Sequence, residues 1–112
     1  MDVAATLIKY LDTATDIEWY HNSPANAPAE YGTLTRDGGP SEIVRDMPTV
    51  TLIVYAASRG RLANLASSVK RALIAAKWEI DNVFEVEIMS IYYDPLDGKH
   101  RARITASLIV ND

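Results

Sequence analysis

The chain has 112 residues, no cysteine and a formal net charge of -4 at pH 7. This length predicts one domain with a stable core, and the lack of cysteine excludes disulfides, thiolate nucleophiles and thiolate metal ligands. The acidic balance argues against a general phosphate-binding surface, so we expect no specific nucleic-acid partner. No apolar run reaches the roughly 18 residues of a membrane span, and no signal peptide is recognised, so we expect no membrane partner.

One helix and three short strands are predicted in the first part of the chain. Apolar residues recur at helical spacing over residues 3–14, and Asp2 stands where an N-cap is needed. Two prolines keep residues 21–30 in a loop, and the Gly38-Gly39 pair marks a turn with positive φ. The three strands are expected over residues 17–20, 31–36 and 41–45.

The other elements can be placed against residues 46–77, which are predicted to form a strand and an amphipathic helix. Over residues 49–56, the alternation of side chains indicates a strand that is covered on one face and partly covered on the other. Ser58 is the predicted N-cap of the helix, and residues 78–82 are expected to lead out of it. The apolar stripe of the helix, which we interpret as core packing, consists of Leu62, Leu65, Ala66, Val69, Ala72, Leu73 and Ala76.

Two longer strands are predicted at the end of the chain, over residues 83–93 and 101–110. Proline and an Asp-Gly pair mark residues 94–99 as the turn of an antiparallel hairpin. The first of the two strands alternates, with Phe84, Val86 and Ile88 on one face and Glu85 and Glu87 on the other. This contrast is lost from Met89 onward, which indicates a bulge or a second covering surface.

The predicted elements follow the order α-β-β-β-β-α-β-β. Two helices and several short strands in this order predict an α+β fold. We expect a mostly antiparallel sheet of about four to five strands, with both helices packed on one face. The whole chain, residues 1–112, is expected to be a single domain.

No motif points to a catalytic, cofactor or metal site. His21 and His100 have no metal-binding partner at a helical spacing. The Gly38-Gly39 pair lacks the strand, glycine spacing and helix of a dinucleotide-binding loop. Glu85 and Glu87 share a strand face and could act as acid and base, but a solvated strand face explains them more simply. We therefore expect a protein that is not an enzyme, with no catalytic residue and no cofactor.

Charge is distributed unevenly between the second helix and the strand that follows it. Residues 59–77 carry five basic and no acidic side chains, whereas residues 78–98 carry six acidic and no basic ones. Solvated faces would explain this, but so would copies of the chain that meet head to tail and close into a ring. The candidate residues for such an interface are Arg59, Arg61, Lys70, Arg71, Glu85, Glu87, Asp94 and Asp97.

Residues 31–73 resemble the middle of small tail terminator or tail completion proteins of long-tailed bacteriophages and related prophages. The features that carry the resemblance are Arg36 with Gly38 and Gly39, the Asp-x-Pro of Asp46 and Pro48, the Tyr-Ala-x-Ser-Arg from Tyr55 to Arg59, and the Ala-rich helix from Ala63 to Leu73. The opening helix with its Pro-rich loop and the closing hairpin also fit the layout of that family.

The resemblance implies a structural virion protein that forms a ring, usually of six copies, on the end of the tail tube. Its partners would be further copies of itself, the tail tube protein and the head connector protein. Its location would be the phage tail, after assembly in the bacterial host cytoplasm. A head closure or connector protein of the same junction is the nearest alternative.

Two other classes stay open at the level of sequence. One is a small α+β enzyme or ligand-binding domain with its site between the sheet and residues 21–30. A pocket with perturbed carboxylates or histidines would favour it. The other is a nucleic-acid-binding protein, which would need a basic patch that the composition hardly provides.

Overall fold

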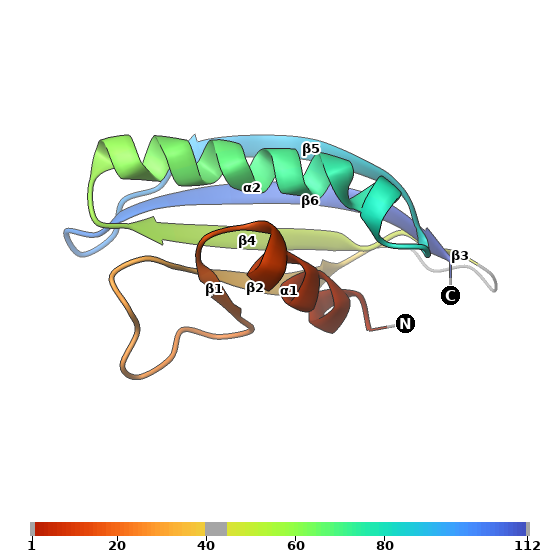
Figure 1. Ribbon diagram of the computed structural model, residues 1–112, viewed down its shortest axis with the longest axis horizontal. Helices are drawn as coiled ribbons and strands as arrows, with labels where there is room; N and C mark the ends of the chain where they lie inside the picture. The colour runs from red at the N-terminus through yellow and green to blue at the C-terminus, as the bar shows by residue number, and fades with distance from the viewer. Residues whose placement is uncertain (1, 40–44, 112) are drawn as a thin grey trace.

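The computed structural model of the protein describes residues 2–39 and 45–111 (Figure 1). The elements follow the order predicted from the sequence, which confirms the α+β class. They are α1 (Val3–Ala14), β1 (Glu18–Tyr20), β2 (Tyr31–Gly38), β3 (Arg45–Asp46), β4 (Thr49–Ala56), α2 (Arg59–Glu79), β5 (Val83–Tyr93) and β6 (His100–Asn111).

Across the described residues the strands form one six-stranded sheet. Every pair in it is antiparallel except β1 with β2, which is parallel. β4 and β5 pair with the same part of β6, so they lie on opposite sides of it. The sheet has six strands rather than four to five because the three-residue β1 and the two-residue β3 both pair into it.

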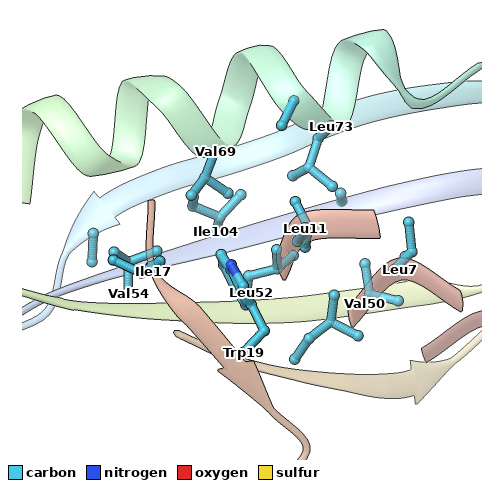
Figure 2. Close-up of a cluster of buried hydrophobic side chains, with 14 of the residues drawn as sticks. Leu7, Leu11, Ile17, Trp19, Val50, Leu52, Val54, Val69, Leu73 and Ile104 are labelled. Atoms are coloured by element: carbon cyan, nitrogen blue, oxygen red, sulfur yellow. The ribbon is translucent and has the colours of Figure 1, made fainter. Parts of the chain in front are cut away.

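Both helices pack on one face of the sheet, as predicted (Figure 1). Apolar side chains of α1 and α2 meet alternate residues of β4 and β6 in a single buried cluster, part of which Figure 2 shows. Leu11, Leu52, Leu73 and Ile104 are fully buried there. Each such side chain contributes about 1.5–3 kcal/mol on transfer from water, so this cluster is the main source of stability.

Capping side chains begin both helices where the sequence predicts. Asp2 accepts a hydrogen bond from the Ala5 amide at 3.0 Å, and Ser58 accepts one from the Arg61 amide at 3.1 Å. α2 continues to Glu79, so the prediction that Trp78 leads out of the helix was wrong. Neither Gly nor Pro stands at residues 74–80, so nothing stops the helix earlier.

The outermost long strand, β5, contains two register shifts against β6. One lies between Ile88 and Ser90, so of the two explanations expected for the lost alternation, a bulge or a second covering surface, the structure shows the bulge. The other lies between Val83 and Glu85, and it corrects the prediction that Phe84 shares a face with Val86 and Ile88. Val83 is buried in place of Phe84, whose side chain is 53% exposed. An extra residue is tolerated here because an edge strand has ladder bonds on one side only.

The turn after β2 confirms the predicted positive φ at both glycines, with φ of 138° at Gly38 and 110° at Gly39. β2 extends two residues beyond its predicted end, to Gly38. Most of the strand predicted over residues 41–45 lies outside the described residues. Its last residue, Arg45, begins β3.

Candidate functional site

The predicted basic interface residues all lie on α2, on the layer that covers one face of the sheet. Lys70 and Arg71 are exposed to solvent, and Arg71 donates a hydrogen bond to Ser67 at 3.0 Å. Arg59 lies over the ring of Tyr93, with its guanidinium carbon 5.2 Å from the ring centroid. Lys70 forms no ion pair with any described residue, so its charge is available to a partner.

The predicted acidic residues of β5 lie on the opposite face, which neither described helix covers. Glu85 and Glu87 pair with Ile109 and Ser107 of β6, which alternate with the buried residues of that strand. Both carboxylates are exposed. A carboxylate oxygen of Glu85 lies 3.9 Å from the ammonium nitrogen of Lys77, a contact that contributes little because it is long and exposed.

The remaining acidic candidates lie at the β5–β6 turn and differ from each other. Asp94 accepts hydrogen bonds from Arg101 at 2.9 Å and Arg103 at 3.4 Å, so its charge is neutralised within the subunit. Asp97 occupies the tip of the turn with φ of 52° and forms no ion pair in the described part of the chain. Asp94 therefore has its charge satisfied within the subunit, whereas Asp97 has no such partner among the described residues.

Arg61 anchors the loop that leads into β2. Its Nε lies 3.0 Å from one carboxylate oxygen of Glu30 and 3.2 Å from the other. Glu30 also accepts a hydrogen bond from the Ala57 amide at 3.3 Å. The hydrogen bond from Arg61 holds the pKa of Glu30 below its ordinary value. Sequence periodicity gives no sign of this pair, because its members are 31 positions apart.

A hollow of about 310 Å³ lies between residues 21–30 and the β5–β6 turn, where the ligand-binding alternative would place a site. Tyr31 and Tyr55 line it and stack with ring centroids 4.4 Å apart and planes 9° from parallel. An adjoining hollow of about 470 Å³ shares both tyrosines and Lys99. Sequence analysis expected any such site between the sheet and residues 21–30, but it did not name Tyr31 or Tyr55, which meet only because β2 pairs with β4.

The tyrosines of these hollows are hydrogen-bonded within the subunit. Burial raises the pKa of Tyr55, but hydrogen bonds with Arg101, Ser23 and Tyr31 outweigh it and bring that pKa below its ordinary value. Arg101 also donates to the Asp94 backbone carbonyl at 2.7 Å. No buried polar side-chain atom among residues 2–39 and 45–111 lacks a hydrogen-bond partner. These hydrogen bonds therefore tie the loop and the turn to the sheet.

An exposed apolar surface follows β5, and we call it the β5 band. Its residues are 39–58% exposed, and they are Phe84, Met89, Ile91, Tyr92 and Tyr93. Beside it, an apolar groove of about 200 Å³ separates β5 from the first turns of α2 and is lined by Leu62, Ala66 and Ile91 among others. The sequence signal for this band is the loss of alternation beyond Met89. Ile91 and Tyr93 lie on the helix-covered face and Tyr92 on the other, so the band is a row of apolar side chains along the edge strand.

The described residues of the motif that carries the family resemblance serve the fold. Arg36 binds Asp46 through two hydrogen bonds of 2.6 and 2.8 Å, and Asp46 is buried. A Cβ at Gly39 would collide with the backbone of Met47. These positions fix the path from β2 to β4, so the motif has a structural explanation.

In the part of the chain that the structure describes, no group of three or more acidic or histidine side chains could hold a metal ion. Neither helix there has the length and apolar character needed to cross a lipid bilayer. The sequence matches no family model and no curated protein. The tail terminator resemblance therefore stays a prediction.

Proposed function

We propose that the protein is a structural virion protein of the tail terminator kind. In this proposal, copies of the chain form a ring on the end of a phage tail tube, stop its growth and join it to the head connector. A head closure role at the same junction would use the same type of subunit. The contacts of the ring are between neighbouring copies, and no catalytic residue or cofactor takes part.

The observation that carries this proposal is that exposed basic side chains of α2 and exposed acidic side chains of β5 lie on opposite faces of the molecule. Lys70 and Arg71 extend from α2 on one side, and Glu85 and Glu87 extend from the helix-free face on the other. A ring needs two different surfaces that fit each other, because each copy contacts one neighbour with each of them. Opposite charges on different faces supply such a pair and disfavour contacts between identical faces.

Two further observations support a structural role. The order and packing of the elements agree with the layout that the resemblance implies. The carboxylate beside the loop whose pKa is shifted, Glu30, is paired with Arg61 within the subunit, so this shift has a structural explanation and does not favour the enzyme and ligand-binding alternatives.

The proposal is tested by the mass of the purified protein at increasing concentration, with and without a tail tube protein from the same genome. We expect a species near six subunits, seen as rings by electron microscopy and bound at tube ends. The double substitution Lys70→Glu, Arg71→Glu should raise the concentration needed for ring formation on the order of tenfold, because like charges then face each other.

Two matched variants make this test specific. Adding Glu85→Lys and Glu87→Lys to the double substitution should restore the ring, since the charges are then exchanged rather than lost. Lys9→Glu, an exposed change on α1, should have no effect. Rings that are indifferent to Lys70→Glu, Arg71→Glu would refute the charged contact. Absence of rings both alone and with tubes would refute the proposed function.

A further inference from the structure

The two edges of the sheet are not equally open to another strand. β1 forms one edge with only three residues, and the amide of its central residue, Trp19, donates to Asp12 at 2.8 Å. β5 forms the other edge with eleven residues, and no described segment pairs with its outer side. β5 contains neither Pro nor Lys, and although its bulges and glutamates can also protect an edge, its second run, residues 90–93, carries no charge. β5 is thus the edge that can accept a further strand.

We infer that in the free protein β5 pairs antiparallel with β5 of a second copy across a two-fold axis. The inference goes beyond the proposed ring and does not depend on it. A two-fold contact is complete with two copies, whereas a ring needs two different surfaces. The second copy is the partner because its β5 offers the same unpaired backbone and the same β5 band.

The bulge at Met89 makes β5 complementary to itself. It divides the strand into two regular runs, residues 85–88 and 90–93. Four apolar residues of these runs lie on the helix-covered face, because each pairs with a buried residue of β6. The four pairs are Val86 with Leu108, Ile88 with Ala106, Ile91 with Ile104, and Tyr93 with Ala102. A two-fold axis between Met89 and Ser90 therefore aligns each run with the other run of the second copy, face to face.

Side-chain chemistry favours this alignment. It places Val86 beside Tyr93 of the second copy and Ile88 beside Ile91 of the second copy, which buries part of the β5 band. On the other face it places Glu87 beside Tyr92 of the second copy. Within that copy, Tyr92 pairs with Arg103 of β6. Cross-strand apolar pairs stabilise a sheet. The same alignment sets Glu85 beside Asp94 of the second copy, but the charge of Asp94 is neutralised by Arg101 and Arg103 of its own subunit. A parallel alignment in register would instead set the acidic residues of β5 against each other.

A cysteine introduced at the axis tests this contact directly, because the chain has no cysteine of its own. Met89→Cys should form a disulfide-linked dimer on mild oxidation, since a two-fold axis brings this position next to itself. Phe84→Cys is the matched control, with similar exposure on the same strand. In the antiparallel dimer its two copies lie more than roughly 30 Å apart, at about 3.3 Å per residue, so it should not cross-link.

A second pair of variants gives an equilibrium measurement. Met89→Lys brings two like charges together at the axis and should raise the dimer dissociation constant at least about tenfold. Ile74→Lys, an exposed change on α2, should leave it unchanged. A monomeric Met89→Cys protein after oxidation, or equal cross-linking of Phe84→Cys, would overturn the inference.

These outcomes separate the inference from the proposed function. A head-to-tail ring sets Met89 against a different residue of its neighbour, so rings without Met89→Cys cross-links would overturn the dimer and leave the ring intact. Cross-linked dimers without rings, even in the presence of tail tubes, would support the dimer and refute the ring.

Discussion

The two edge strands of the sheet, β1 and β5, differ in whether their outer backbone groups are open to another strand. At the β1 edge the chain is short, and Trp19 is buried, with its ring nitrogen donating to Thr15 at 2.9 Å. At the β5 edge the chain is long, and the side chains of the β5 band face solvent. Local contacts from α1 protect the first edge, whereas nothing described within the subunit protects the second.

This difference between the β1 and β5 edges indicates that contacts between copies should be sought at β5. An edge that is stabilised by its own subunit is part of the fold, and substitutions there should affect the free energy of unfolding. An open edge is a surface, and substitutions there should affect association and leave unfolding nearly unchanged. The next three predictions test the first half of this contrast.

The largest effect is expected for Trp19→Ala. Trp19 is 4% exposed and packs against Gly32, where a Cβ would come within 2.5 Å of the indole ring. Loss of this ring should lower the free energy of unfolding by about 3–5 kcal/mol, because a large cavity is left between α1 and β2. Urea denaturation measures the change. A loss below about 1 kcal/mol would show that the β1 edge is not held by Trp19.

A smaller effect is expected for Asp12→Ala. This change removes the acceptor of the outward amide of β1, at a cost of about 1 kcal/mol for one net hydrogen bond. The Trp19 amide should then exchange its hydrogen faster, as an open edge does. Asp12→Asn keeps an acceptor oxygen and serves as the control. Equal exchange in the Ala and Asn variants would contradict the assignment of Asp12 as the protecting group.

The smallest effect is expected for Glu30→Gln, which loosens the connection from β1 to β2. The pKa of Glu30 is lower in the folded state, so its ion pair with Arg61 stabilises the fold above the unfolded-state pKa. This contribution is lost as the pH falls through the folded-state pKa. The melting temperature of the variant should therefore lie slightly below that of the unchanged protein at neutral pH and equal it in acid. A difference independent of pH would contradict this.

The sequence by itself determined the elements and their order. Periods of two and of about 3.6 residues can be read from the chain because they arise from local backbone geometry. Asp2 and Ser58 were found as caps for the same reason, since a cap acts within three residues of itself. The loss of alternation at Met89 was also visible, but the sequence left a bulge and a second covering surface as its two explanations.

Only the tertiary structure decided which residues meet across long separations. Phe84 was placed on the wrong face because its position depends on the register with β6, which no local pattern reports. Tyr31 and Tyr55 stack, and Glu30 binds Arg61, only because β2 pairs with β4 and the loop folds against the start of α2. The open edge was likewise invisible, since an edge is defined by the strand that is absent beside it. Local propensity fixes the strands, but pairing and burial decide which of them remains free for a partner.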